Sequence, residues 1–427
     1  MSRIAIIGTG YVGLTCGACF AHLGHDVVCV DVDPAKVDQL QRGHVPIVEQ
    51  GLDELVAEGM LSGNLRFVLG AAGAVGDREF VFLCVPTPQG DDGSADLSYV
   101  QAAAREIAPL LAQGAIVVNK STVPVGSAGL VAGVLRRPDV SVVSNPEFLR
   151  EGTAVTDFLH PDRVVVGSTN AAAGRAVAQL YAAVEAPVVV TDPESAETIK
   201  YAANAFLATK LSFVNAIAAI CEGVGADVND VLHGMGLDRR IGADFLRPGP
   251  GWGGSCFPKD TRALQRIALD AGYSFDLLDA AVAANEQQFL RIAHKIRAAA
   301  GGSLDGVAVA IWGLTFKAGT DDLRDSPSLA VIAHLLAEGA VIRAYDPAIA
   351  THAHPLPTGI ELCADAYDAV AGAQVLVLLT EWPDFHMVEP AKVAEHMPGR
   401  SVIDARNVLD RSAWLAAGFV YAGNGYQ

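Results

Sequence analysis

Positive charge is scarce in this sequence. Its 427 residues include 30 lysines and arginines against 48 aspartates and glutamates, so the formal net charge is −18. A protein that binds nucleic acid needs a basic surface to meet the phosphate backbone, and this balance therefore excludes that class of partner. A small molecule that carries phosphate is compatible with the sequence, because a pocket needs only a few local cations.

Charged residues of either sign are few, and the cysteines form no disulfide pattern. Charged residues make up 18% and hydrophobic residues 51% of the chain, and the mean hydropathy is +0.32. Such a composition is too apolar for a disordered protein. The seven cysteines are odd in number and stand mostly in apolar runs, which is typical of reduced thiols in a cytosolic protein. We therefore expect a compact cytoplasmic protein of two or three domains, at about 150 residues per domain.

No charged residue lies between Arg3 and Asp26. The intervening stretch could be mistaken for a signal peptide or a membrane span. Glycines, among them Gly8, Gly10 and Gly13, interrupt its apolar character, and no stop-transfer pattern follows. The sequence therefore predicts no targeting segment and no membrane partner.

Short runs of Val and Ile alternate with Ala-rich stretches over roughly the first 195 residues. These runs read IAII, VVCVDVD, EFVFLCVP, AIVVNKS, VSVVSNP, RVVVGS and APVVVTD. Uninterrupted apolar strands are typical of a parallel sheet that helices cover on both faces. The alternation resumes at about residue 301 with GVAVAIWG, AVIRAYDP, AQVLVLLT and SVIDAR, which predicts a second α/β sheet.

Between the two alternating blocks, the stretch from about residue 193 to 223 has no internal proline or glycine. It predicts one long helix, too long for a simple crossover between strands. The predicted fold is therefore α/β, with two Rossmann-like, doubly wound parallel-sheet domains joined by a long central helix. We place the three parts at residues 1–195, 196–300 and 301–427.

A dinucleotide-binding pattern lies at the start of the chain. The first strand runs into Gly8-x-Gly10-x-x-Gly13, a helical stretch follows, and the second strand ends at Asp31, 18 residues after Gly13. The glycines allow a tight turn and a close approach of the backbone, so a pyrophosphate can bind at the helix N-terminus. A carboxylate at Asp31 binds the adenosine ribose hydroxyls and repels a 2′-phosphate. The pattern therefore predicts NAD rather than NADP.

Two other groups of residues resemble metal ligands. Cys16, Cys19 and His22 form a C-x-x-C-x-x-H pattern, but on the first helix this spacing forms a stripe that we expect to pack on the sheet. His352 and His354 are expected to be solvated loop residues. We predict no metal site.

Cys256 differs from the other six cysteines in its surroundings. It stands in a glycine-rich loop just before a helix that Pro258 can start at its first position. The helix N-terminus, together with Lys259 and Arg262, favours the thiolate. Asp260 could then serve as a base or orient a water molecule. The local sequence alone is also compatible with a buried structural cysteine beside a conventional helix cap.

Several motifs identify a family. They are GTGYVG, VPTP (85–88), STVPVG (121–126), NPEFLREG (145–152), a helix with Lys200 and Asn204, and GGSCFPKD (253–260). These motifs, and the order in which they occur, resemble those of the nucleotide-sugar 6-dehydrogenases of the UDP-glucose/GDP-mannose dehydrogenase family. The resemblance covers nearly the whole chain and favours the interpretation of Cys256 as a nucleophile.

The resemblance implies an NAD-dependent, four-electron oxidation of the C6 alcohol of UDP-glucose to UDP-glucuronate. In this family the thiolate adds to an aldehyde, giving a thiohemiacetal that is oxidised to a thioester and then hydrolysed. The first part of the chain would bind NAD, the central helical part would dimerise, and the last part would bind the UDP-sugar. The product would serve polysaccharide biosynthesis or a related pathway.

The resemblance also implies roles for individual residues. Cys256 would be the nucleophile, and Lys200 and Asn204, which are spaced i, i+4, would stabilise the oxyanion. By spacing alone, a surface lysine with a polar neighbour is the other interpretation of that pair. The residues implied to position water or transfer protons are Asp260, Thr122 and Glu147, with Glu147 the base for thioester hydrolysis.

Two larger sets follow from the same resemblance. Those implied to contact the cofactor are Gly8, Gly10, Val12, Gly13, Asp31, Lys36, Thr87, Thr122, Glu151, Lys259 and Arg324. Those implied to contact the substrate are Glu147, Phe148, Leu149, Arg150, Glu151, Lys200, Asn204, Arg240, Phe245, Leu246, Arg247, Gly249, Gly253, Lys317 and Arg406. In the family, the residue that Arg240 matches reaches the substrate of the neighbouring subunit, so a homodimer is implied.

Two residues depart from the family pattern, and several alternatives stay open. Trp252 stands where relatives often carry Phe, and Ala405 stands where they often carry Gly. The same chemistry on TDP-glucose, GDP-mannose or a UDP-N-acetylhexosamine is one alternative. An ordinary two-electron hydroxyacid dehydrogenase and a non-catalytic, NAD-sensing or scaffold protein are the others.

Overall fold

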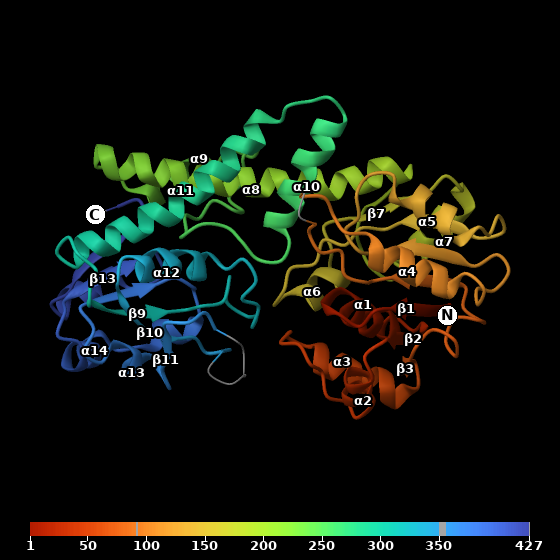
Figure 1. Cartoon of the computed structure of the whole chain (residues 1–427), viewed down its shortest axis with the longest axis horizontal. Coiled ribbons are helices and arrows are strands. Elements are labelled where there is room, and N and C mark those ends of the chain that lie inside the picture. Colours follow the sequence, from red (N-terminus) through yellow and green to blue (C-terminus); the bar gives the residue numbers. More distant parts are fainter. Residues whose placement is uncertain (91–92, 350–355, 427) are drawn as a thin grey trace. The chain divides into compact units, whose positions relative to one another are not determined.

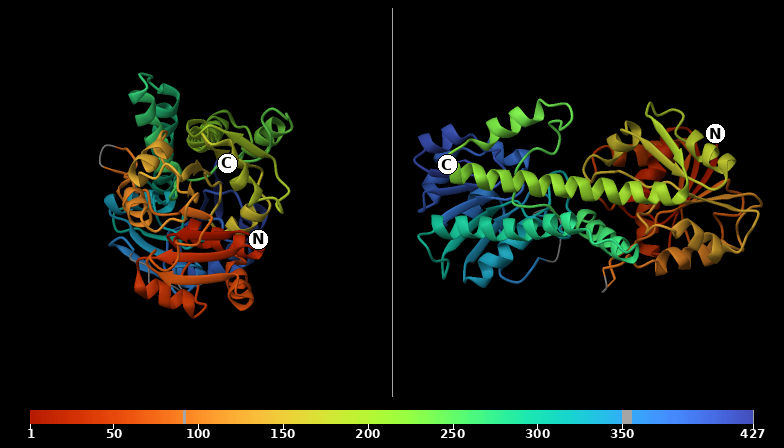
Figure 2. Two further views of the ribbon diagram at one scale, coloured as in Figure 1. Left: turned by 90° about the vertical axis from the view of Figure 1, so that its right-hand side faces the viewer. Right: turned by 90° about the horizontal axis from the view of Figure 1, so that it is seen from above.

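The computed structural model describes residues 1–90, 93–349 and 356–426, so His352 and His354 lie outside the described residues. The chain forms two compact units (Figures 1 and 2). Unit 1 comprises Met1–Ala203 and Arg262–Gly272, and unit 2 comprises Asn204–Thr261 and Tyr273–Gln427.

Unit 1 contains an eight-stranded sheet in the order β3-β2-β1-β4-β5-β6-β7-β8. The strands are β1 (Arg3–Ile7), β2 (Asp26–Asp31), β3 (Leu65–Leu69), β4 (Phe80–Leu83), β5 (Ile116–Asn119), β6 (Ser141–Ser144), β7 (Val164–Gly167) and β8 (Val188–Thr191). The helices are α1 (Tyr11–His22), α2 (Pro34–Gln41), α3 (Leu52–Ser62), α4 (Ser98–Ile107), α5 (Ser127–Leu135), α6 (Ala154–Leu159) and α7 (Ala171–Gln179). The predicted α/β class is confirmed.

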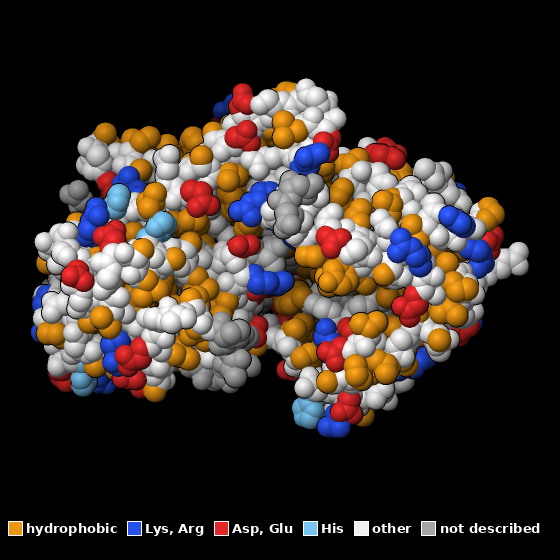
Figure 3. Space-filling view, viewed as in Figure 1, with side chains coloured by type: hydrophobic (Ala, Val, Ile, Leu, Met, Phe, Trp, Pro, Cys, Tyr) orange, Lys and Arg blue, Asp and Glu red, His pale blue; other side chains and the backbone are white. Residues whose placement is uncertain are grey.

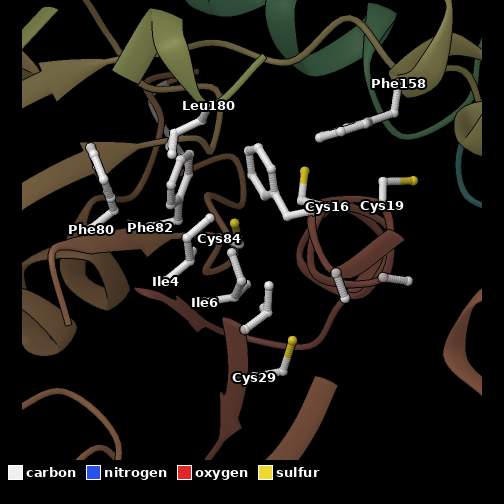
Figure 4. Packing of buried hydrophobic residues seen from close by; sticks show 14 of the residues in the cluster. Ile4, Ile6, Cys16, Cys19, Cys29, Phe80, Phe82, Cys84, Phe158 and Leu180 are labelled. Carbon is white, nitrogen blue, oxygen red and sulfur yellow. The ribbon is translucent and has the colours of Figure 1, made fainter. Parts of the chain in front are cut away.

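Alternate residues of β1 enter two separate cores, as the two-residue period of a strand requires. Ile4 and Ile6 pack with α1, α3, α6 and α7 on one face of the sheet, whereas Ala5 and Ile7 pack with α4 and α5 on the other. Figure 4 shows the first core, in which Cys16 of α1 lies among apolar side chains from several elements. The uninterrupted apolar runs thus become strands with helices on both sides.

Two features of the unit 1 sheet differ from expectation. Strand β7 pairs with β6 in the antiparallel sense through Ser144 and Gly167, although the other neighbouring strands are parallel. In addition, Val188, Val189 and Val190 of β8 are 42–50% exposed, because β8 is an edge strand of the sheet. A run of valines indicates a strand. It does not determine whether the strand is parallel to its neighbours or whether helices cover both faces of the strand.

Unit 2 repeats the first six positions of this topology in a parallel sheet with the order β11-β10-β9-β12-β13-β14. The strands are β9 (Ala308–Trp312), β10 (Val341–Tyr345), β11 (Ile360–Leu362), β12 (Val375–Leu378), β13 (Ser401–Asp404) and β14 (Val420–Gly423). The helices of this sheet are α12 (Pro327–Ala337), α13 (Ala366–Val370), the 3₁₀ helix η1 (Pro383–Met387), α14 (Pro390–His396) and α15 (Arg411–Ala416). The prediction of a second Rossmann-like sheet is confirmed. Strands β3, β11 and β14 were not predicted, because their short sequences lack the Val and Ile runs.

The predicted long helix is α8 (Pro193–Val224), which contains 32 residues. It is followed by α9 (Val228–Gly236), α10 (Phe257–Asp270) and α11 (Asp276–Ala299). By length and composition α8 could span a membrane, but the core helices of globular proteins pass the same test. On the face of each unit that Figure 3 shows, acidic and basic side chains are interspersed.

Candidate active site

The turn after β1 has the geometry that a dinucleotide-binding fold requires. Gly8 has a φ of +97°, and an added Cβ would lie 2.6 Å from the carbonyl oxygen of Cys84. An added Cβ at Gly13 would lie 1.9 Å from the carbonyl oxygen of Gly8. Only glycine fits at these two positions, because the helix, the turn and the neighbouring strand meet there at backbone distance.

The N-terminus of α1 fits the pyrophosphate of NAD. Gly10 is the N-cap residue and offers no side chain to the first N–H groups of the helix. An added Cβ at Gly10 would meet no protein atom within 4 Å. Helical N–H groups that no side chain caps, beside open space, form an anion-binding site.

Asp31 ends β2 beside this turn. One carboxylate oxygen accepts hydrogen bonds from the backbone N and the Oγ1 of Thr9, at 2.9 and 2.6 Å, and Lys36 Nζ lies 3.5 Å from the same oxygen. Burial alone would raise the pKa of Asp31, but these bonds, the N–H of Asp33 and the Lys36 charge hold the pKa below its ordinary value. Asp31 is therefore a carboxylate at neutral pH, as recognition of ribose hydroxyls requires.

Other predicted cofactor residues of unit 1 lie at the same end of the sheet. Thr87 and Thr122, which follow β4 and β5, are both buried, and Thr87 Oγ1 donates to the carbonyl oxygen of Thr122 at 2.9 Å. Val12 lies in the first turn of α1, and Glu151 directly precedes Gly152. The carboxyl ends of β1, β2, β4 and β5 thus carry most of the predicted cofactor residues.

Lys200 of α8 and Glu147 form a buried ion pair. The distance from Lys200 Nζ to Glu147 Oε1 is 3.1 Å, and the two side chains are 4% and 5% exposed. The second Glu147 oxygen accepts a hydrogen bond from the backbone N of Leu149 at 2.5 Å. Lys200 Nζ also lies 5.3 Å from the centre of the Phe148 ring. This arrangement rules out the alternative of a lysine on a helix surface.

The charge state of Glu147 follows from its neighbours. Burial would raise the pKa of this carboxyl, but the charge of Lys200, the N–H of Leu149 and the charge of Lys120 hold the pKa below its ordinary value. Glu147 is therefore ionised at neutral pH. A buried carboxylate beside an ammonium can accept a proton and release it again during a reaction.

In unit 2, Cys256 differs structurally from the other cysteines. All seven lie in the described part of the chain; six are buried, whereas Cys256 is partly exposed. It directly precedes α10, which begins at Phe257, so that Pro258 is the second helical residue rather than the first as predicted. The position at a helix N-terminus favours the thiolate. The alternative of a buried structural cysteine is not supported.

Asp260 lies one turn after Cys256 and is fully buried. Its Oδ2 accepts a hydrogen bond from Nδ2 of Asn204 at 2.6 Å, and its Oδ1 lies 2.5 Å from Lys259 Nζ. Its backbone N donates to the carbonyl oxygen of Cys256 at 2.9 Å. Three residues that were predicted separately, Asn204, Lys259 and Asp260, are therefore joined in one network next to the thiol.

The glycine-rich loop before Cys256 is close to other predicted substrate residues. An added Cβ at Gly249 would lie 3.1 Å from Nη1 of Arg406, and one at Gly253 would lie 1.9 Å from the carbonyl oxygen of Asp325. Arg406 also donates to the carbonyl oxygen of Phe316 at 3.2 Å, next to Lys317. Gly249, Arg406 and Lys317 are thus brought together within unit 2.

Four other predicted residues are arginines that are exposed in this single chain. The Arg240 side chain is 88% exposed and pairs with Asp238 of its own turn. Arg150 and Arg324 are also exposed and pair with nearby aspartates, and Arg247 is exposed. Phe245 and Leu246 precede the glycine-rich loop, where Leu246 is buried.

Three segments of the chain match the UDP-glucose/GDP-mannose dehydrogenase family. Residues 2–185 match its NAD binding domain, residues 194–287 its central domain, and residues 310–411 its UDP binding domain. The chain belongs to the UDP-glucose/GDP-mannose dehydrogenase family. It is therefore an NAD-dependent nucleotide-sugar dehydrogenase, and the predictions of NAD and of a nucleotide-sugar substrate are confirmed.

Individual members of the UDP-glucose/GDP-mannose dehydrogenase family are similar over nearly their full length. UDP-glucose 6-dehydrogenase of Rhizobium meliloti is 46% identical to this chain, and the alignment covers 99% of each of the two chains. UDP-glucose 6-dehydrogenase TuaD of Bacillus subtilis is 45% identical over 99% of this chain and 92% of the relative. The solved structure of a UDP-glucose dehydrogenase from Pyrobaculum islandicum has a TM-score of 0.92 and 36% identity, over 100% of this chain and 98% of that one.

The alternative of a hydroxyacid dehydrogenase receives support for the fold alone. The structure of 3-hydroxyisobutyrate dehydrogenase from Mycobacterium tuberculosis has a TM-score of 0.51 at 15% identity, over 78% of this chain and 99% of that one. Such a likeness shows a shared fold and not a shared reaction.

The cysteines and histidine that resemble metal ligands have other environments. Cys16 and Cys19 are buried in the core of unit 1, where burial raises the pKa of Cys16 to about 11 and raises that of Cys19 further (Figure 4). His22 does not pack on the sheet as predicted, since its Nδ1 lies 3.2 Å from Glu58 Oε2 on the surface. Among the described residues, no three His, Cys, Asp or Glu side chains are placed to hold a metal ion.

Some site-supporting residues were missed by the sequence analysis. Lys120, just before the STVPVG motif, is buried, and its Nζ lies 3.2 Å from both Asn145 Oδ1 and Tyr181 OH. Glu197, one turn before Lys200, accepts hydrogen bonds from the backbone N of Gly126 and Ala128. A lysine at the end of the apolar run AIVVNK was a signal that could have identified Lys120 as a special position.

Proposed function

We propose that this chain is a UDP-glucose 6-dehydrogenase that oxidises UDP-glucose to UDP-glucuronate with two NAD. The observation that carries the proposal is a partly exposed thiol, Cys256, directly before α10 and next to the Asn204–Asp260 hydrogen bond. Relatives named for this activity, at 46% and 45% identity over nearly the full chain, support the choice of substrate.

The chemistry requires a nucleophile as well as a dinucleotide. When bound, NAD accepts a hydride, once in each oxidation. The first oxidation removes a hydride from C6 and a proton from its hydroxyl, leaving an aldehyde. The Cys256 thiolate then forms a bond to C6, and the oxygen takes up a proton to give a thiohemiacetal. The second oxidation removes the remaining hydride and that proton, leaving a thioester on Cys256.

Hydrolysis completes the reaction. Water adds to the thioester carbon, the bond between C6 and sulfur breaks, and the products are the sugar carboxylate, the free thiolate and protons. In sum, one alcohol, one water and two NAD give one carboxylate, two NADH and three protons. We assign Glu147 as the base that takes the proton from water, because it is ionised at neutral pH and held in place by Lys200 and Leu149.

We assign Lys200 and Asn204 to stabilise the oxygen of C6 when it becomes negative. They lie one turn apart on α8, the ammonium is fixed by Glu147, and the amide is fixed by Asp260. Donors that are already fixed need no reorganisation when the charge develops, and each typically contributes a few kcal/mol. Asp260 and Thr122 are assigned to orient water.

We propose that NAD binds to the residues of unit 1 around the α1 N-terminus, where Asp31 contacts the ribose. Lys259 and Arg324 of unit 2 are proposed as further contacts. The nucleotide sugar is assigned to the glycine-rich loop with Lys317 and Arg406, which supply cations to a diphosphate. The domain boundaries proposed from the sequence give residues 1–195 to NAD binding, 196–300 to dimerisation and 301–427 to UDP-sugar binding.

We propose a homodimer that forms through α8. Phe206, Phe213 and Ile220 follow one another at seven-residue spacing on one helix face and are 69%, 51% and 57% exposed in the single chain. A second copy would cover this apolar stripe, and Arg240 would serve the neighbouring subunit as the family resemblance implies.

The dimer is tested by sedimentation velocity of the wild type and of Phe213→Asp. We expect the wild type to sediment as a dimer and the variant as a monomer at micromolar concentration, because a carboxylate would be buried against apolar side chains. Leu61→Asp, which changes an exposed apolar residue of α3, is the matched control. A wild type that stays monomeric would exclude the proposed dimer.

We also propose a cytoplasmic location without a metal or a membrane partner. None of the seven cysteines, all of which lie in the described part of the chain, forms a disulfide, and six of them are buried. This state fits a reducing compartment.

The substrate is tested by offering nucleotide sugars separately to the purified protein with NAD. UDP-glucose is expected to give the highest kcat/KM, by at least about tenfold, over TDP-glucose, GDP-mannose and UDP-N-acetylglucosamine, and the product should be UDP-glucuronate by mass. A higher kcat/KM for one of the other sugars would overturn the assignment of UDP-glucose while keeping the family chemistry.

A further inference from the structure

Residues 246–253, in the glycine-rich loop that leads to Cys256, form neither helix nor strand. Residues 248–250, 252 and 254 are nevertheless buried, so the polar groups of their backbone need partners within the protein. A buried N–H or C=O group without a partner would destabilise the folded protein.

A single side chain supplies both partners for Trp252, four residues before the nucleophile. Asn285 of α11 accepts a hydrogen bond from the backbone N of Trp252 at 2.8 Å. Its Nδ2 donates to the carbonyl oxygen of the same residue at 2.9 Å. Asn285 is 4% exposed, so water cannot readily replace either bond. Its carboxamide thus takes the place that a neighbouring strand would occupy in a sheet.

Three further buried amides hold Gly249 in the same way. Asn215 Oδ1 accepts from its backbone N at 2.9 Å, and Gln288 Nε2 and Asn424 Nδ2 donate to its carbonyl oxygen at 2.8 and 2.9 Å. These amides come from α8, α11 and the segment after β14, and all are at most 5% exposed. Buried side-chain amides therefore hold the loop at two points, and the backbone N of Gly254 adds a bond to the carbonyl oxygen of Asp325 at 3.2 Å.

Only glycine fits at the residue between these two anchors. Gly251 has a φ of +139°, which L side chains rarely adopt, and an added Cβ would lie 2.3 Å from the Phe289 ring. The Trp252 ring is buried, and its Nε1 donates to Ser212 Oγ at 2.8 Å. A phenylalanine at this position could not make that bond, because its ring has no N–H donor. The indole thus adds a side-chain anchor to the backbone bonds that Asn285 makes.

We propose that Asn285 is a positioning residue, which fixes the backbone of Trp252 and thereby sets the direction of the Cys256 thiol at the start of α10. The inference rests on the proposed function insofar as Cys256 is the nucleophile. Asn285 touches no reacting atom and acts through four residues of chain. Its two bonds hold the two peptide units that flank the Trp252 Cα, one through its N–H and the other through its carbonyl oxygen.

The test compares Asn285→Ala with Gln287→Ala, an exposed amide two residues further along the same helix. Each protein is assayed at least 20 °C below its own melting temperature, so that a loss of stability alone does not lower the rate. Three quantities are measured: kcat and KM for UDP-glucose, and the rate at which iodoacetamide alkylates Cys256. Asn285→Asp, which retains the acceptor for the Trp252 N–H, is the second variant in case the alanine variant does not fold.

For Asn285→Ala we expect kcat to fall at least about tenfold and the alkylation rate of Cys256 to change at least about threefold. Asn285→Asp is expected to lie between this variant and the wild type, and Gln287→Ala to equal the wild type. Wild-type kcat and alkylation rate in a folded Asn285 variant would overturn the proposal. If the wild type itself does not oxidise UDP-glucose, the proposed function fails, but the alkylation rate still decides whether Asn285 positions the thiol.

Discussion

Replacement of Cys256 by alanine is expected to lower formation of the sugar acid by at least about a thousandfold. Without the thiolate, no thiohemiacetal forms, and the aldehyde has no covalent link that would hold it for the second oxidation. The turn of α1 and Asp31 are in unit 1 and remain intact, so NAD binding should stay within about twofold of the wild type. The first oxidation can then still occur, and an aldehyde with one NADH is the expected trace product.

The measurement is quantification of UDP-glucuronate by chromatography after incubation of each variant with UDP-glucose and NAD. Cys363→Ala is the matched control, since it removes a buried thiol of unit 2 outside the proposed site. Cys256→Ser retains a weaker nucleophile and should accumulate a slowly hydrolysed oxygen ester or lose activity to a similar extent. Acid production by Cys256→Ala at the wild-type rate would remove Cys256 from the mechanism.

Replacement of Lys200 by methionine is expected to reduce both activity and stability. The ammonium lies 3.1 Å from Glu147 Oε1, and both side chains are buried. Its loss leaves a buried carboxylate without its charge partner, which typically costs about 3–5 kcal/mol in the free energy of unfolding. It also removes one donor to the developing oxyanion, for which a loss of about a hundredfold in kcat is expected.

A double variant separates the two effects. Lys200→Met combined with Glu147→Gln removes both charges and should recover most of the free energy of unfolding lost in Lys200→Met. It should not recover kcat, because the oxyanion donor and the base are both absent. Denaturant unfolding and steady-state kinetics of the two single variants and the double variant complete the cycle. Recovery of kcat in the double variant would show that Lys200 has a structural role only.

The same pair predicts a pH dependence of stability. Because the folded protein holds the pKa of Glu147 below its ordinary value of 4.5, its carboxylate stabilises the folded state above that value. This contribution is lost as the pH falls below about 4.5 and through the folded-state pKa. The wild type should therefore lose more stability on acidification than the double variant, which lacks the carboxylate.

The sequence predicted those parts of the site that depend on local backbone chemistry. The backbone requires glycine at Gly8 and Gly13, and ribose binding requires a carboxylate at Asp31. The strands and the helix that surround these residues in the sequence reveal both requirements. The glycines before Cys256 and the helix after it distinguished this thiol from the others, and the family resemblance then favoured its interpretation as a nucleophile. The repeated α/β alternation was sufficient to predict the two sheets, and the absence of internal proline and glycine between about residues 193 and 223 was sufficient to predict the long helix α8.

Features that depend on distant contacts were not predictable in this way. Glu147 and Lys200 were both selected, but their pairing joins residues 53 positions apart. Asn285 carries no signal at all, because an asparagine on a helix has many possible partners and its significance depends on the loop that packs against it. The antiparallel pairing of β7 depends likewise on how the chain returns to the sheet and not on the run of valines.

The most direct test of the four-electron mechanism through Cys256 is the number of NADH molecules formed for each molecule of UDP-glucose consumed. UDP-glucose is supplied in limiting amount to the purified protein with excess NAD, and absorbance of NADH is followed to completion. We expect two NADH for each UDP-glucose, because the aldehyde is retained on Cys256 and oxidised again. One NADH for each sugar, with an aldehyde as the final product, would contradict the cysteine mechanism and leave an ordinary two-electron dehydrogenase.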